Sequence, residues 1–260
     1  MPELPEVEQA ASVLRDAVVG KTFRTVKVLH VAQRRGLPPR DVARLAGVSI
    51  TGIERRGKHQ LIALSSGDTL VVHFRMTGDW LVENEAGPVT KYARVVLELD
   101  GGIRVSLVDP RALSTITLHR DGAEPLPKLG PDAADRTVSV DVFRGALVRR
   151  RIAIKVALLD QRVLAGVGNI YAAEALWEAR INPRAVASSL SRARQARLLE
   201  AVHSVLEKAQ RSAARYRASG EGRFEVYDRE GLPCRRCGHT IRRIVQAGRS
   251  TYFCPHCQRR

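Results

Sequence analysis

The chain has 260 residues, with 43 Lys and Arg against 27 Asp and Glu, so its formal net charge is +16. This length suffices for a hydrophobic core and for two or three small domains. The positive excess exceeds what solubility requires and predicts a polyanionic partner, with nucleic acid first and an anionic membrane second. A membrane partner is disfavoured, because the sequence has no run of 18 apolar residues. Charged residues interrupt the apolar residues near the N-terminus, so we expect no signal peptide and a cytoplasmic, nucleoid-associated protein.

The opening segment, MPELPEVE, predicts a helix from Pro5 onward. Apolar residues recur at helical spacing after it, namely Val7, Ala10, Ala11, Leu14 and Val18. Proline is favoured at the first helical position, and carboxylates in the first turn complement the helix dipole. The helix explains Pro5, Glu6 and Glu8, but it does not explain Pro2 and Glu3.

The rest of the chain divides by pattern into strands, a linker, helices and a tail. Residues 22 to 119 contain short β-rich runs split by turn signals, which favours a sandwich or barrel. Residues 120–135 hold three prolines and two glycines and are typical of a linker. A helical pattern runs from Val140 to about Ala218. Its expected core positions are Leu147, Ile152, Ile154, Leu158, Leu159, Leu176, Leu198, Leu199, Val202 and Leu206.

All four cysteines of the chain lie in two pairs near the C-terminus, Cys234, Cys237, Cys254 and Cys257. Two Cys-x-x-Cys pairs separated by 16 residues are typical of a tetrahedral four-thiolate zinc site. Disulfides are disfavoured in a cytoplasmic chain. With no ligand position left for water, the one zinc ion is expected to be structural. The same tail has seven arginines and no carboxylate, so we interpret His239 and His256 as bystanders and the tail as anion-binding.

The segment Ala165–Tyr171, AGVGNIY, separates two helical patterns. Asn169 suits the N-cap of a helix over Ile170–Arg180, and backbone N–H groups at such a terminus can bind an anion. The alternative is an ordinary joint between helices. The basic tail favours phosphate binding, and Lys155, one helix earlier, would face the same groove.

Pro2 becomes chemically significant when Met1 is removed, because it then carries a free secondary amine. An α-amino group has a pKa of about 7.7–8.0, against about 10.4 for lysine, so a larger share of it is uncharged at neutral pH. Such an amine can attack a sugar aldehyde carbon and form an iminium ion that favours elimination. Glu3 is then a candidate acid/base and Glu6 a second carboxylate.

Several short motifs, taken together and in order, resemble the Fpg/endonuclease VIII family of formamidopyrimidine-DNA glycosylases. They cover almost the full length of the chain: PELPEVE at the N-terminus, the lysine of Arg55–Lys58, His73–Gly78, Asp109–Arg111, Gly166–Tyr171 and Gly248–Cys254. The resemblance implies an α+β fold: an N-terminal helix plus β-sandwich in residues 1–130, a helix-two-turn-helix domain in 131–222 and a zinc β-hairpin in 223–260. The implied partner is double-stranded DNA containing damaged bases or abasic sites, bound by a monomer.

The resemblance also implies roles for matching residues. Pro2 corresponds to the iminium nucleophile, Glu3 to the acid/base at the sugar ring oxygen, and Glu6 to a carboxylate that orients the lesion or water. The implied phosphate ligands around the flipped nucleotide are Lys58, His73, Asn169, Tyr227 and Arg249. Met76 and Arg111 correspond to two of three residues that fill the hole left by the extruded base.

Two departures from the family pattern bear on the lesion. Leu113 stands where the third hole-filling residue is usually Phe, and the segment Ser219–Phe224 is several residues short. The implied activity is a bifunctional glycosylase/lyase that removes formamidopyrimidines, and 8-oxoguanine more weakly, by β,δ-elimination. Two alternatives stay open: an endonuclease VIII-like preference for oxidised pyrimidines, and a non-catalytic DNA-binding zinc protein of the same fold.

Overall fold

The computed structural model describes residues 1–123, 125–212 and 224–259. They form two compact units. Unit 1 comprises residues 1–2 and 6–127, and unit 2 comprises residues 3–5 and 128–260. Within the described ranges, no helix combines the length and the apolar character that crossing a membrane would require. The predicted end of the helical pattern near Ala218, and all of Ser219–Phe224 except Phe224, lie outside the described residues.

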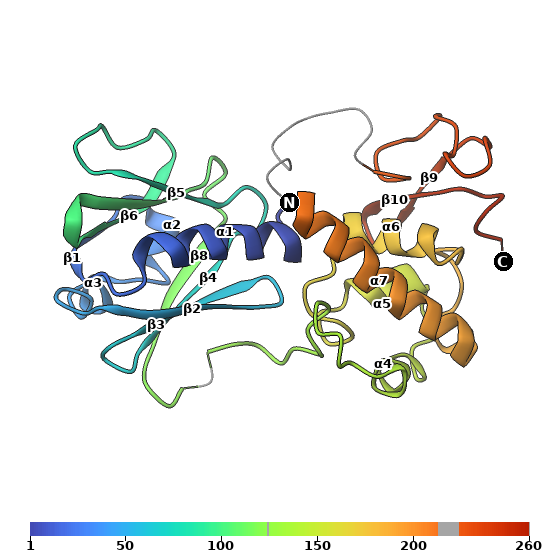
Figure 1. The fold of residues 1–260 in the computed structure, drawn as a ribbon, viewed down its shortest axis with the longest axis horizontal. Coiled ribbons are helices and arrows are strands. Elements are labelled where there is room, and N and C mark those ends of the chain that lie inside the picture. The colour runs from blue at the N-terminus through green and yellow to red at the C-terminus, as the bar shows by residue number, and fades with distance from the viewer. Residues whose placement is uncertain (124, 213–223, 260) are drawn as a thin grey trace. The chain divides into compact units, whose positions relative to one another are not determined.

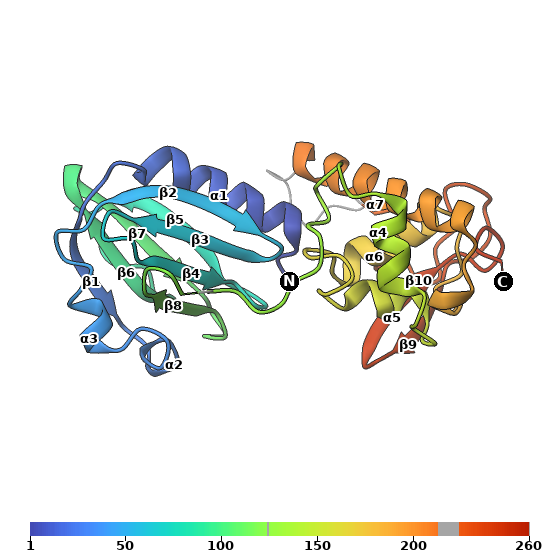
Figure 2. The same cartoon turned by 90° about the horizontal axis from the view of Figure 1, so that it is seen from below.

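Unit 1 is built on two four-stranded antiparallel sheets (Figures 1 and 2). One sheet has the order β1-β6-β7-β5 and the other β2-β3-β4-β8. The strands are β1 (Phe23–Val28), β2 (Ile50–Arg56), β3 (His59–Leu64), β4 (Thr69–His73), β5 (Asp79–Asn84), β6 (Ala93–Leu99), β7 (Ile103–Val108) and β8 (Thr115–His119), with the 3-10 turn η1 (Asp100–Gly102) between β6 and β7.

Helix α1 (Leu4–Val18) completes the core of unit 1, as its apolar spacing predicts. Val7, Ala11, Leu14 and Val18 are buried against apolar side chains of both sheets. The helix runs beside β2 in both views, and the Arg15 Nε donates to the carbonyl of Ile53 at 2.9 Å (Figures 1 and 2). Burial of one stripe of the helix therefore fixes α1 on the sandwich.

Two short helices interrupt the region predicted to be strands. After β1 ends, the His30 Nδ1 accepts the Ala32 N–H and caps α2 (Val31–Arg34). Pro39 then occupies the first position of α3 (Pro39–Val42), where its fixed φ suits a helix. The first strand of this region therefore ends at Val28.

Unit 2 is a helical core with a two-stranded hairpin. Its helices are α4 (Val140–Leu147), α5 (Ile154–Leu159), α6 (Asn169–Glu178), η2 (Ala187–Ser189) and α7 (Arg192–Ser212), and the hairpin is β9 (Arg242–Gln246) with β10 (Arg249–Phe253). The predicted core positions are buried or half-buried with one exception. Ile152 is 42% exposed, because it precedes α5 in a segment where Ala153 forms a β-bridge with Val186 and helical spacing does not apply.

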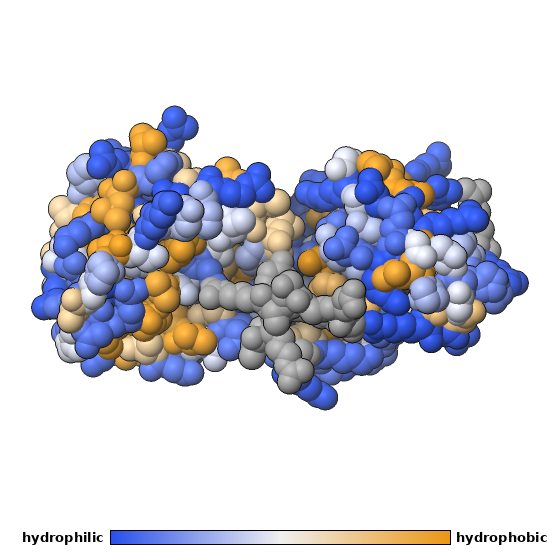
Figure 3. All heavy atoms as spheres, turned by 90° about the horizontal axis from the view of Figure 1, so that it is seen from above, coloured by the Kyte–Doolittle hydropathy of each residue, from blue (hydrophilic) through white to orange (hydrophobic). Residues whose placement is uncertain are grey.

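The second half of the predicted linker packs into unit 2. Its Gly130 N–H donates to the Gln161 carbonyl, and its Ala133 N–H to the Ala165 carbonyl, both at 2.9 Å. Ala133 is fully buried. Hydrophilic residues cover most of the face shown in Figure 3, as the net charge of +16 leads one to expect.

Candidate active site and nucleic-acid interface

The buried carboxylate of Glu3 lies at the N-terminus of α6. Its oxygens accept the backbone N–H groups of Gly168 and Ile170 at 2.9 Å and of Tyr171 at 3.3 Å. An anion therefore does occupy this helix terminus, as the sequence suggests, but it is Glu3 and not a phosphate. Asn169 is not the N-cap; Gly168 is, and it has no capping side chain. The helix instead fixes a carboxyl group directly after Pro2 in the chain.

Glycines make room for this arrangement. A Cβ at Gly168 would lie less than 3.0 Å from three atoms of the Glu3 side chain. A Cβ at Gly166 would meet Leu4 in the same way, and its φ of +105° disfavours other residues. The GVG sequence is therefore explained by the close approach of residues 3 and 4.

Lys155 is fully buried, and its ammonium braces the hairpin against the helices. The Nζ donates to Asn169 Oδ1, to Thr251 Oγ1 at 2.8 Å and to the Ser250 carbonyl at 3.2 Å. Burial lowers the pKa of Lys155 to about 8, with Arg249 acting in the same direction and Glu3 in the opposite one. The expectation that Lys155 faces a DNA phosphate is wrong, because its three N–H donors are directed to protein oxygens.

Asn169 and Tyr227 lie next to the Lys155 ammonium and its hydrogen bonds. The Asn169 Nδ2 donates to the Ser250 carbonyl at 3.1 Å, so the amide is held at both ends. The half-buried ring of Tyr227 packs edge-to-face on Phe224 and Tyr252. Burial raises the pKa of the Tyr227 phenol, and a hydrogen bond with Asn169 partly opposes the rise. Unit 2 thus brings Glu3, Asn169 and Tyr227 into one neighbourhood, with exposed Arg249 at the start of β10.

Glu174 is a site residue that the sequence analysis missed. Its carboxylate accepts the N–H groups of Glu225 at 2.8 Å and of Val226 and Tyr227 at 2.9 Å. Burial raises the pKa of Glu174, while these three hydrogen bonds oppose the rise. The chain entering the hairpin is therefore anchored to the middle of α6. The available signal was a lone carboxylate inside the apolar run YAAEALW.

The four cysteine sulfurs form a compact cluster that fits one zinc ion. All four ligand atoms lie within 4.8 Å of one another, with Cys234 and Cys257 sulfurs 3.9 Å apart and those of Cys237 and Cys254 3.5 Å apart. A tetrahedral zinc with bonds of about 2.3 Å requires sulfur separations of about 3.8 Å. Two protein groups hold the cluster: the Trp177 Nε1 donates to Cys234 Sγ at 3.4 Å, and Arg236 stacks over the Trp177 ring at 3.8 Å.

His239 and His256 lie at the edge of the zinc cluster. Both are exposed, and their rings stack with centroids 4.0 Å apart. They are close enough to Cys237 to form a second candidate group with it, but four thiolates already complete a tetrahedron. Their interpretation as bystanders stays a prediction.

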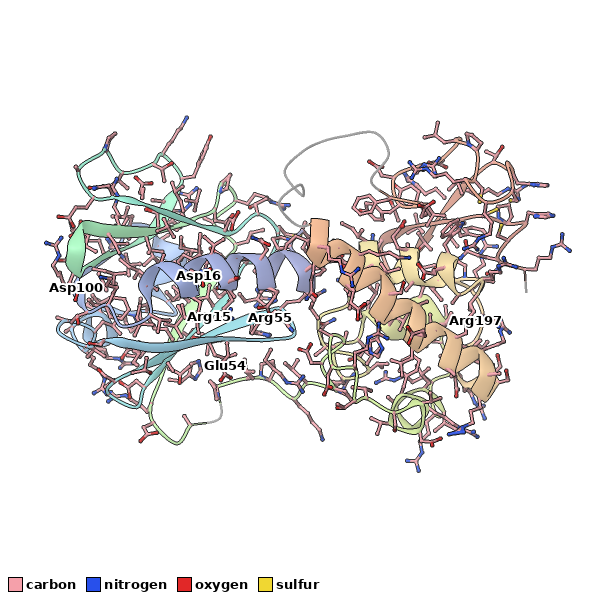
Figure 4. All side chains as sticks on the ribbon, viewed as in Figure 1. Arg15, Asp16, Glu54, Arg55, Asp100 and Arg197 are labelled. Carbon is pink, nitrogen blue, oxygen red and sulfur yellow. The ribbon has the colours of Figure 1, made fainter. Side chains whose placement is uncertain are left out.

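In unit 1, Lys58 lies in the two-residue turn between β2 and β3. The exposed fraction of Lys58 is 9%. Arg55 donates to Glu8 Oε2 at 2.7 Å and to the Gly57 carbonyl at 3.1 Å, while Arg15 approaches the same Glu8 at 3.5 Å. Arg15 and Arg55 come from α1 and β2 and lie side by side (Figure 4). This ion-pair network ties the turn that presents Lys58 to helix α1.

His73 ends β4, with its ring against His59 at a centroid distance of 4.7 Å. Burial lowers the pKa of His73 to about 3, and the charges of His59, Arg75 and Lys58 act in the same direction. The Nδ1 accepts the Arg75 N–H at 3.0 Å. A neutral ring that accepts at Nδ1 carries its proton on Nε2, so His73 can donate to a phosphate without being charged.

The remaining predicted residues also belong to unit 1. Met76 and Leu113 are 40% and 43% exposed, and Arg111 is exposed on the same loop as Leu113. Pro2 and Glu6 are partly buried. Exposed apolar side chains on tight loops are suited to insertion into a base stack.

Comparison with protein families assigns the three parts of the chain to known domains. Residues 1–116 match the formamidopyrimidine-DNA glycosylase N-terminal domain, and residues 129–217 match its H2TH domain. Residues 231–260 match the zinc finger found in FPG and IleRS. The chain belongs to the formamidopyrimidine-DNA glycosylase family. It is accordingly a DNA glycosylase of base-excision repair with one structural zinc.

Curated members of the family match this chain from end to end. The formamidopyrimidine-DNA glycosylase of Herpetosiphon aurantiacus is 41% identical, with 99% of this chain and 100% of that protein covered. The enzyme of the same name from Heliobacterium modesticaldum is 40% identical, with both chains fully covered.

Solved structures of formamidopyrimidine-DNA glycosylases have the same fold. The Lactococcus lactis enzyme bound to DNA with an abasic site superposes with a TM-score of 0.92 at 30% identity, with both chains fully covered. A complex of the same enzyme with DNA containing FAPY-dG gives 0.91 at 29% identity, covering 99% of this chain and 100% of that one. The neighbours of this glycosylase thus include proteins bound to damaged DNA.

Proposed function

We propose that this glycosylase is bifunctional: it excises formamidopyrimidines from double-stranded DNA and cleaves the strand at the resulting abasic site by β,δ-elimination. The amine of Pro2, exposed by removal of Met1, is the nucleophile. Glu3 is the acid/base, and Glu6 and Lys58 assist at the same reaction centre. The protein acts as a monomer, in the cytoplasm where the nucleoid lies, through three parts: residues 1–130, 131–222 and 223–260.

The observation that carries the proposal is the fixed carboxylate of Glu3. Three backbone N–H groups at the end of α6 hold it, and its chain neighbour is the residue that would supply the amine. A DNA-binding module has no need for a buried carboxylate at this point. A reaction that moves a proton beside the amine requires one in a fixed position.

The proposed reaction balances without an oxidant or a reductant. The lone pair of the Pro2 nitrogen attacks C1′ of the damaged nucleotide, the bond from C1′ to the base breaks, and the base leaves with the electron pair and is protonated by water. The Glu3 carboxylate takes the proton that the Pro2 nitrogen loses and delivers it to the ring oxygen O4′ as the C1′–O4′ bond breaks, which leaves an iminium ion. Loss of a C2′ proton forms an enamine that expels the 3′ phosphate. Loss of the C4′ proton then expels the 5′ phosphate, and water hydrolyses the remaining iminium bond at C1′ and so releases the amine.

The polar residues of both units supply the DNA contacts in this proposal. Lys58 and Arg249 neutralise phosphates as cations, His73 donates from Nε2, and Asn169 and Tyr227 contact the backbone of the flipped nucleotide. Lys155 acts indirectly by holding Asn169 and β10. Met76, Arg111 and Leu113 fill the hole left by the extruded base, as enzymes that act on flipped bases require.

The lesion preference follows from the third hole-filling residue. Leu113 fills volume but cannot stack, and aromatic stacking on a base is worth about 1–3 kcal/mol. We therefore propose that formamidopyrimidines and abasic sites are the main substrates, that 8-oxoguanine is processed more slowly, and that oxidised pyrimidines are a side activity.

Single-turnover cleavage of duplexes that carry each of these lesions tests the proposal. Glu3→Gln should lower the rate by about 100-fold or more. Glu178→Gln, at the other end of α6, is the matched control and should stay within about threefold of wild type. Binding of damaged duplexes without cleavage by the wild-type protein would favour the non-catalytic alternative. Fastest cleavage at oxidised pyrimidines would favour the endonuclease VIII-like one.

A further inference from the structure

The loops that carry Met76 and Leu113 are both crossings between the two sheets of unit 1. Residues 74–78 connect β4 to β5, and residues 109–114 connect β7 to β8. Strands β4 and β8 pair in one sheet, and β5 and β7 pair in the other. His73 lies opposite Thr115 and Asp79 opposite Val108. The first crossing therefore begins beside the end of the second and ends beside its beginning.

One buried carboxylate joins the two crossings. Asp109 is fully buried and accepts the Arg111 N–H at 3.1 Å and the Ser114 N–H at 2.6 Å, both within its own loop. It also accepts the hydroxyl of Thr77 from the other loop. Although burial acts to raise it, these hydrogen bonds leave the pKa of Asp109 below its ordinary value.

Further contacts hold the backbone of the 109–114 crossing. The Gln33 Nε2 donates to the Ser114 carbonyl at 2.7 Å, and the Arg94 Nε donates to the Asp109 carbonyl at 2.6 Å. A Cβ at Gly78 would lie 2.7 Å from the Phe74 carbonyl oxygen and 3.1 Å from the Ser114 Cβ. The two crossings are therefore in close contact, and the bond from Thr77 to Asp109 links them through side chains.

We propose that Asp109 and Thr77 are positioning residues that make the two crossings one rigid element, so that Met76 and Leu113 enter the duplex together. The inference rests on the proposed function, because it takes these two side chains to be the wedge. Neither Asp109 nor Thr77 reaches the base stack in this role. They act by fixing the separation of Met76 and Leu113, so that less conformational entropy is lost when these two side chains enter the duplex.

Thr77→Val removes the link and leaves the bonds of Asp109 within its own loop. Thr77→Ser keeps the hydroxyl and is the matched control. Insertion is monitored through the fluorescence of 2-aminopurine placed beside a tetrahydrofuran abasic analogue. This analogue cannot be cleaved at the glycosidic bond, so the measurement does not depend on catalysis. Thr77→Val should slow the fluorescence rise by about fivefold or more, with a thermal midpoint close to wild type, and Thr77→Ser should have the wild-type rate.

A mutant cycle between Met76→Ala and Leu113→Ala separates positioning from simple stability. With Thr77 present, the double variant should reduce the insertion rate by a smaller factor than the product of the two single reductions. In the Thr77→Val background the two factors should multiply, because Met76 and Leu113 then insert independently. Equal rates for Thr77→Val and wild type, or unchanged coupling in the cycle, would overturn the inference. If wild type gives the fluorescence rise but cleaves no damaged duplex, the proposed function fails and the positioning role is still measured.

Discussion

Replacing Gly168 by Ala should disable the enzyme without unfolding it. The added Cβ would lie 2.5 Å from Oε1 and 2.7 Å from Cγ of Glu3, whereas ordinary contact begins at 3.4 Å, so the carboxylate has to move by about 1 Å. That shift stretches hydrogen bonds of 2.9 Å beyond bonding range. A misplacement of about 1 Å costs about 100-fold in rate, and loss of one hydrogen bond to the carboxylate costs about 1.5–3 kcal/mol of stability.

The assay is single-turnover cleavage of a formamidopyrimidine duplex, with circular dichroism melting of the same samples. Gly145→Ala is the matched control, since a Cβ there meets nothing within 4 Å and the residue lies within α4. It should leave the rate unchanged and be neutral or slightly stabilising. A Gly168→Ala protein that is folded and cleaves at the wild-type rate would refute the role assigned to the position of Glu3.

Three further predictions concern other parts of the molecule. Because folding lowers the pKa of His73 from 6.5 to about 3, the unfolded ring alone takes up a proton below pH 6.5, and stability falls as the pH drops. Between pH 6.5 and 4.5, the free energy of unfolding measured in urea should therefore fall by roughly 1–2 kcal/mol less in His73→Asn than in wild type. Equal pH dependence in the two proteins would contradict the burial argument. Metal analysis should give about one zinc per chain, and Trp177→Phe should speed zinc transfer to a chelator because Cys234 loses its N–H donor; equal transfer rates would contradict that role. Arg249→Ala should weaken binding to all duplexes and lower the salt slope by about one, whereas an unchanged slope would assign the phosphate contact to another arginine.

The sequence predicts best those features that depend on local spacing. The Cys-x-x-Cys pairs predict the metal site, because four thiolates on two turns have few other uses in that pattern. The apolar spacing of α1 predicts its buried stripe, since 3.6 residues per turn fixes which side chains share a face. The amine of Pro2 with Glu3 beside it is likewise a local pattern, and its role stays a prediction.

Features that depend on contacts between distant residues could not be predicted. Glu3 meets residues 168–171, more than 160 positions away, so the helix terminus looked available for phosphate. Lys155 was expected to face the same groove as that terminus, but its ammonium is buried and donates to oxygens of Asn169 and Thr251. Periodicity placed Ile152 in the core, although a bridge to Val186 beside it sets an extended backbone instead. In each case hydrogen bonds between distant parts of the chain overrode a prediction that was consistent with the local sequence.

The nucleophile is tested most directly by mapping the covalent adduct that borohydride traps on a formamidopyrimidine duplex. Peptide mass spectrometry should find the reduced sugar remnant on the Pro2 nitrogen of a chain that lacks Met1. A variant extended before Pro2 should give no adduct while it still binds DNA. An adduct on a lysine such as Lys58, or undiminished trapping by the extended variant, would contradict the proline mechanism.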